Sequence, residues 1–161
     1  MGTTNYKMQG FLTGATNYTY GEDIADTKSP FEMAVNFGSA TVAGTTLTVT
    51  NAFRIGQGCV IPENCNVSSI FGWMTSNGTN TITLAMCKVT PTANNSSNLQ
   101  PVVIDEIELT GLNSNNKMIT INETTITTAS LSAGDIIFPM VKESSAGSTI
   151  YFNVNVQTTS F

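Results

Sequence analysis

The chain has 161 residues and contains no histidine. Its charged residues make up 11% of the sequence, and its formal net charge is −5. This length suits one domain with its own hydrophobic core. The six basic residues stand singly and no apolar run reaches the ~18 residues of a membrane span, so neither nucleic acid nor a membrane is an expected partner.

The commonest polar residues are Thr, Asn and Ser. Thr favours strands, while Asn and Ser favour turns, so the composition already predicts an all-β fold. The first residues, MGTTNYKMQG, lack the charged start and the apolar core of a signal peptide. We therefore expect synthesis in a cytoplasm.

Residues 1–30 combine several glycines with isolated large apolar side chains and show no period of a strand or a helix. The segment is too apolar for a free linker and too irregular for a core element. We expect an extended N-terminal arm that docks on a partner, with a poorly ordered terminus as the alternative. The side chains expected to make this contact are Tyr6, Met8, Phe11, Leu12, Tyr18 and Tyr20.

Short strand signals separated by turn residues recur through residues 31–161, which we expect to form one folded unit. About eight to ten strands at this spacing are typical of an antiparallel β-sandwich. No segment has the caps and the apolar stripe of a helix. The segments are, in order, FEMAVNFG, ATVAG, TLTVT, AFRIGQGCVIP, NVSSIFGWMTS, TNTITLAMCKV, VVIDEIELTGL, KMITINETT, TTASLSAG, DIIFPMVKE and STIYFNVNVQT.

Two dipeptides between these segments carry specific turn signals. Asn77-Gly78 supplies the positive φ angles of a tight turn, which predicts a hairpin between the flanking strands. At Gly134-Asp135 the glycine supplies a positive φ and the aspartate accepts hydrogen bonds from neighbouring amides, which predicts a corner before the strand that follows.

The runs NVSSIFGWM and DIIFPM are apolar on both alternating faces. The core of a two-sheet sandwich covers only one face of each sheet, so the second face needs other cover. We expect an identical subunit to supply it, and a loop or the N-terminal arm is the alternative. The residues expected at this subunit interface are Phe71, Trp73, Ile137, Phe138 and Met140.

The residues suited to catalysis are few. The absence of histidine removes Ser-His-Asp and Cys-His arrangements and most zinc sites. Glu106 and Glu108 stand two apart on one strand face, a spacing compatible with the acid pair of an inverting glycoside hydrolase. Two acids on a solvated strand face are common, however, and no aromatic-lined cleft is expected beside them. Cys59, Cys65 and Cys87 are expected to be reduced thiols, although a Cys59–Cys65 disulfide is conceivable. We expect no enzyme activity, cofactor or metal.

The segments CVIPENCNVSSIFGWMTSNGTNTITLAMCKV, LSAGDIIFPMVK and STIYFNVNVQ together resemble small jelly-roll proteins of tailed-phage virions, which are similar in layout to trimeric C1q- and TNF-like β-sandwiches. The resemblance covers roughly residues 31–161. It implies a jelly roll, a homotrimer and a role in capsid decoration or as a head fibre, on the capsid surface of a virion whose proteins are made in the host cytoplasm. It also implies that the N-terminal arm grips the major capsid protein.

The expected function is therefore that of a viral structural protein, a capsid decoration or cement protein that binds the major capsid protein as a homotrimer. The alternative is a glycan- or receptor-binding module at a tail-fibre tip or in an adhesin. That function would use the loops TANNSSNLQ and NSNNK with an aromatic platform at Trp73 or Tyr151.

Overall fold

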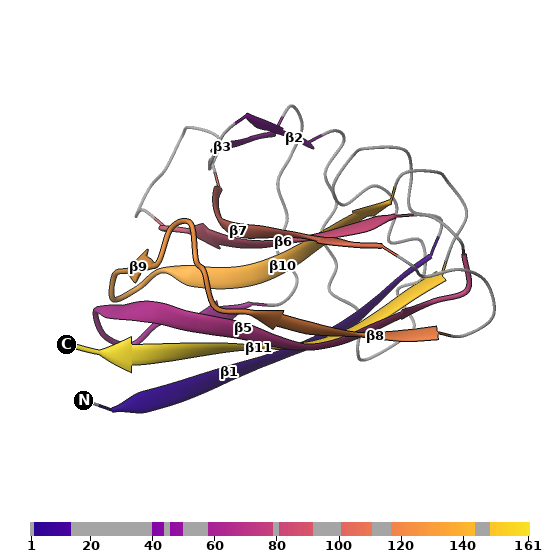
Figure 1. The fold of residues 1–161 in the computed structure, drawn as a ribbon. Coiled ribbons are helices and arrows are strands. Elements are labelled where there is room, and N and C mark those ends of the chain that lie inside the picture. The colour runs from indigo at the N-terminus through magenta and orange to yellow at the C-terminus, as the bar shows by residue number, and fades with distance from the viewer. Residues whose placement is uncertain are drawn as a thin grey trace.

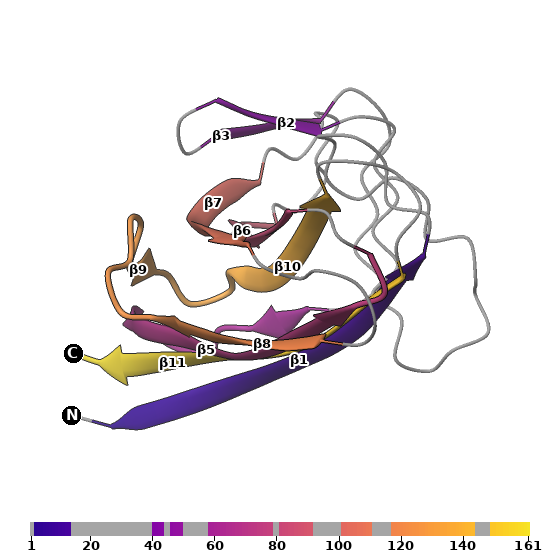
Figure 2. The same cartoon turned by 45° about the vertical axis from the view of Figure 1, so that its right-hand side comes forward.

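The computed structural model describes residues 2–13, 40–43, 46–49, 58–78, 81–91, 101–110, 117–143 and 149–161. These ranges form eleven strands in two antiparallel sheets that lie face to face (Figures 1 and 2). No helix occurs within them. The prediction of an antiparallel all-β sandwich is confirmed.

The first sheet has the order β1-β11-β5-β8, with the short β9 beside β5. Its strands are β1 (Thr3–Thr13), β5 (Cys65–Ser76), β8 (Lys117–Glu123), β9 (Ser130–Leu131) and β11 (Thr149–Ser160). The second sheet has the order β2-β3-β7-β6-β10-β4. Its strands are β2 (Ala40–Ala43), β3 (Thr46–Val49), β4 (Cys59–Val60), β6 (Ile82–Val89), β7 (Val102–Leu109) and β10 (Ile136–Glu143).

The strand order is that of a jelly roll. When the short β2, β3 and β9 are set aside, the first, eighth, third and sixth of the remaining strands form one sheet. The second, seventh, fourth and fifth form the other. This order arises when a long antiparallel ribbon is rolled up so that its strands alternate between two sheets, which is the double Greek key of the jelly roll.

The N-terminal segment corrects the expected domain boundary. Residues 3–13, which we expected outside the sandwich, form β1 and pair with β11 in continuous register from Thr3↔Thr159 to Thr13↔Thr149. The Gly2 amide donates to Ser160 Oγ at 2.9 Å, so the two chain ends meet at one end of the sandwich (Figure 1). The remainder of the expected arm, residues 14–30, lies outside the described residues.

Asn77-Gly78 does not form the expected hairpin. β5 and β6, which flank it, belong to different sheets. The Asn77 side chain instead ties the end of β5 to the start of β11, because its Oδ1 accepts from the Thr149 amide at 2.7 Å. The segment therefore passes from one sheet to the other.

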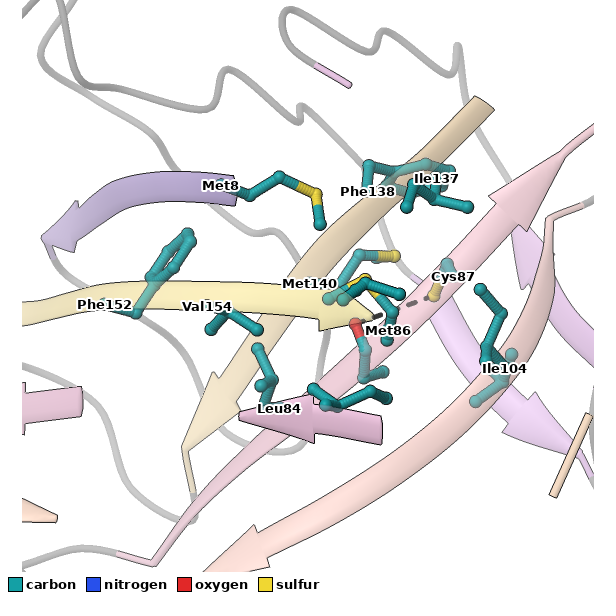
Figure 3. Packing of buried hydrophobic residues seen from close by; sticks show 14 of the residues in the cluster. Met8, Leu84, Met86, Cys87, Ile104, Ile137, Phe138, Met140, Phe152 and Val154 are labelled. Atoms are coloured by element: carbon teal, nitrogen blue, oxygen red, sulfur yellow. Dashed lines mark hydrogen bonds between the residues drawn. The ribbon is translucent and has the colours of Figure 1, made fainter. Parts of the chain in front are cut away.

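The core lies between the sheets and includes both faces of two strands. Figure 3 shows side chains from β1, β6, β10 and β11 gathered in one cluster. In β6 every residue from Ile82 to Cys87 is buried, and in β10 the consecutive Ile137 and Phe138 are both 0% exposed. Cover for both faces of β10 is thus present within a single chain.

This burial corrects three of the expected interface residues. Ile137, Phe138 and Met140 have at most 2% of their surface exposed, so they have no surface left for a neighbouring subunit. The apolar character of DIIFPM on both faces reflects intramolecular packing. Phe71 and Trp73, the other two expected interface residues, are only partly buried.

The Gly134-Asp135 corner has the predicted geometry. Gly134 has a φ of 91°. The Asp135 carboxylate, 1% exposed, accepts from the Ser132 amide at 2.9 Å and from Thr90 Oγ1 at 2.6 Å, and Lys88 Nζ lies 3.4 Å away. A buried carboxylate with all of these partners fixes the start of β10 against the end of β6.

Gly72 is required by the close approach of β5 to β11. A Cβ atom at this position would lie 2.0 Å from the carbonyl oxygen of Asn153, at a φ of +155°. We expect Gly72→Ala to lower the free energy of unfolding by at least about 2 kcal/mol, because the backbone of a central strand must move. Urea denaturation measures the change.

Gly134→Ala is the matched control for this substitution. Its φ is also positive, but a Cβ there meets nothing within 4 Å, so the expected cost is only the strain of about 1 kcal/mol. Equal losses for the two variants would contradict the assignment of steric contact at Gly72.

Candidate functional site: the outer face of the first sheet

The first sheet has one face in the core and one face turned away from it. Along β11 the side chains alternate, with Ile150, Phe152, Val154 and Val156 buried in the core. The intervening residues Tyr151, Asn153, Asn155 and Gln157 are exposed or half-buried. Since cross-strand partners share a face, the registers of β1, β5 and β8 with β11 and with one another define the rest of the outer surface.

Two aromatic side chains occupy the middle of this outer face. Trp73 of β5 pairs with Asn153 on one side and with Thr120 of β8 on the other. In the next row Phe71 pairs with Asn155 and Asn122. Both aromatic rings are half-buried. Each ring is therefore flanked on two sides by groups that form hydrogen bonds without carrying charge.

The rows on either side extend the same pattern. Thr75 pairs with Tyr151 and Met118, which are 50% and 61% exposed. Ser69 pairs with Gln157. β1 adds Asn5, Lys7 and Gln9 along one margin. We call this surface the amide–aromatic face; its described side chains are Asn5, Lys7, Gln9, Ser69, Phe71, Trp73, Thr75, Met118, Thr120, Asn122, Tyr151, Asn153, Asn155 and Gln157.

Charge is nearly absent from the amide–aromatic face. Lys7 is the one charged residue among its described side chains, and no acidic residue belongs to it. The described exposed acids Glu63, Glu106 and Glu108 lie elsewhere, in the β4–β5 connection and on β7. Aromatic side chains without charge are typical of the centre of a protein–protein interface, whereas an ordinary exposed sheet face carries Lys and Glu.

The residues predicted to contact the capsid differ in burial, and two of them fall outside the described residues. Met8 is 5% exposed and belongs to the core, which corrects its expected role as a contact. Tyr6 is half-buried against the same core, and burial raises the pKa of its phenol. The backbones of Phe11 and Leu12 lie in β1, opposite Tyr151 and Ile150. Tyr18 and Tyr20 fall outside the described residues.

The sequence indicated the aromatic residues Phe71, Trp73 and Tyr151 of this face as candidate contacts, but not the polar residues around them. A signal for them is present in the last strand, where every second residue from Asn153 to Gln157 carries an amide side chain. Strict alternation of apolar and amide residues assigns the amides to one face of a strand. Which other strands border that face depends on the strand order, and the sequence does not contain that order explicitly.

The thiols lie away from this face. All three cysteines are free, with Cys65 and Cys87 buried and Cys59 half-buried. Burial raises the pKa of each thiol, and the pKa of the fully buried Cys87 lies far above its ordinary range. No disulfide joins Cys59 and Cys65 in this structure.

The acidic side chains of the described residues do not form a cluster that could act as a metal site. Glu106 and Glu108 are exposed, and their cross-strand neighbours are Ala85 and Thr83. No group of three or more His, Cys, Asp or Glu side chains in the described residues is arranged to hold a metal ion. In the same residues no helix has the length and apolarity to span a membrane.

No protein-family model matches the chain, and a search of curated proteins finds no significant match.

The thiols allow a test of the packing. At pH 7 to 8 we expect iodoacetamide to modify Cys59 slowly and to leave Cys65 and Cys87 unmodified in the native protein. The reason is that burial both blocks access and raises each pKa, which lowers the thiolate fraction at a given pH. In denaturant all three should react at similar rates. Peptide mass spectrometry measures each site, and labelling of Cys87 as fast as Cys59 in the folded protein would refute the packing.

Proposed function

We propose that this protein is a viral structural protein, a capsid decoration protein that binds the major capsid protein as a homotrimer and stabilises the shell. The amide–aromatic face is the observation that carries the proposal, because it provides a surface for association between copies. The resemblance of residues 59–89, 131–142 and 148–157 to virion jelly-roll proteins supplies the capsid role.

Self-association through this face is favoured by its lack of charge. The whole chain has a net charge of −5, which opposes the approach of identical copies at most of their surface. The described side chains of the amide–aromatic face add no negative charge to this repulsion, and burying Phe71 and Trp73 removes apolar area from water. Amide side chains can donate and accept at once, so one copy can satisfy the amides of another.

A second candidate function uses the same face. Trp73 lies between Asn153 and Thr120, and an aromatic ring flanked by neutral hydrogen-bonding groups can stack on a sugar ring while bonding its hydroxyl groups. In that case the face would bind a neutral glycan, as expected of a fibre tip or adhesin. The two functions differ in what covers the face: a copy of the chain or an oligosaccharide.

A charge placed in the face tests the proposal. We expect Asn153→Glu to weaken association by at least about a hundredfold, because it brings like charges together in a desolvated contact. The control is Val60→Glu, which adds the same charge at a side chain 61% exposed on β4, outside the face. Light scattering on a sizing column measures the mass of each variant across a range of concentrations.

A trimer for the parent chain and for Val60→Glu, with monomers for Asn153→Glu, supports the proposal. Co-sedimentation with capsid shells that lack the protein then tests the partner, and we expect the parent chain to bind. A monomeric parent whose Trp73 emission changes on adding neutral oligosaccharides would establish the glycan function instead. Trimers that fail to bind any shell would contradict the capsid role.

A further inference from the structure

β1 is joined to the sandwich through one neighbour. Its register with β11 runs without a shift over the whole strand. Within the described strands none pairs with its other edge. Among the described strands its one pairing is with β11, so removing β1 breaks one ladder of the sheet. Every other strand pair of the sandwich stays as it is.

Main-chain pairing with β11 runs the whole length of β1, and its Tyr6 and Met8 side chains pack against the core. Of its described side chains only Met8 is buried, while Thr3, Thr4, Asn5 and Lys7 are exposed. At the terminus the Ser160 amide donates to the Gly2 carbonyl oxygen at 3.1 Å. A main-chain ladder can form with a strand from another chain as well as with one from the same chain. The sites that receive Tyr6 and Met8 are the same in every copy. β11 of any copy can therefore accept β1.

The connection that follows β1 is long enough to reach a second copy. Residues 14–39 separate β1 from β2, which belongs to the other sheet. A segment of about 26 residues extends to at most roughly 90 Å. A domain of this size is only about 40 Å across. The length of the connection thus allows β1 to reach a neighbouring subunit as well as its own sheet.

β1 also lies where the subunits are proposed to meet. Its Asn5, Lys7 and Gln9 form one margin of the amide–aromatic face. When two copies associate through that face, the seam between β1 and β11 lies at the edge of the contact in each of them. This step rests on the proposed function.

We propose that β1 is exchanged between subunits, so that β1 of each chain completes the first sheet of a neighbouring copy. Each sandwich keeps the same contacts, and the exchange adds a covalent connection between subunits. Dissociation then requires the β1–β11 ladder to open in addition to the separation of the two faces. The oligomer should accordingly exchange subunits slowly, as suits a protein that reinforces a shell.

A pair of cysteines across the seam tests the exchange. Asn5 and Gln157 are register partners, with Gln157 Nε2 3.4 Å from Asn5 Oδ1, a placement compatible with a disulfide between cysteines at the two positions. The Asn5→Cys/Gln157→Cys variant is assembled, oxidised and run on a denaturing gel without reductant. Exchange predicts that most chains migrate as covalently linked oligomers.

The matched control is Ser69→Cys/Gln157→Cys, which places the same Cys at position 157 and joins β11 to β5 within one sheet. It should give single chains only, and the parent chain under the same oxidation measures any linkage through the native thiols. Equal oligomer formation in test and control would overturn the exchange, because the linkage would then arise from contact between faces.

Light scattering on the same samples separates the two proposals. Single chains in the test variant, together with a trimeric mass before denaturation, would overturn the exchange and leave the proposed function intact. A monomeric mass before denaturation would contradict the proposed association, and the exchange would fall with it.

Discussion

The alternation of side chains along β11 is the constraint on which the rest of the structure depends. Its apolar residues from Ile150 to Val156 enter the core, and the residues between them form the outer face. Because β11 pairs with β1 on one side and β5 on the other, its register fixes which side chains of three strands share each face. A shift by one residue would turn the core outward and the amides inward.

This constraint separates two kinds of apolar surface that look alike in the sequence. The apolar residues of β6 and β10 are buried on both faces within one chain. Phe71 and Trp73 keep part of their surface exposed, and their cross-strand neighbours carry neutral amide or hydroxyl groups. Since screening by salt acts on charges, association through such a face should depend little on ionic strength. The proposed subunit contact and the exchange of β1 both start from this surface.

The sequence was sufficient for the fold class and for the corner at Gly134-Asp135, because both depend on short-range patterns. It was insufficient for β1, in which inward Tyr6 and Met8 alternate with polar residues but Gly10 and the adjacent Phe11-Leu12 obscure the period. It also misplaced Asn77-Gly78, since a turn signal specifies the bend of the chain and leaves open which sheet the next strand joins. The burial of Ile137 and Phe138 depends on segments distant in sequence, and local periodicity contains no information about them.

The central claim is that subunits meet at the amide–aromatic face, and the single tryptophan of the chain, Trp73, lies in that face. The most direct measurement is therefore its fluorescence, with acrylamide quenching, across a dilution series whose masses are known from light scattering. We predict emission at shorter wavelength and weaker quenching in the oligomer than in the dissociated chain. An oligomer in which Trp73 emits and is quenched as in the monomer would contradict it.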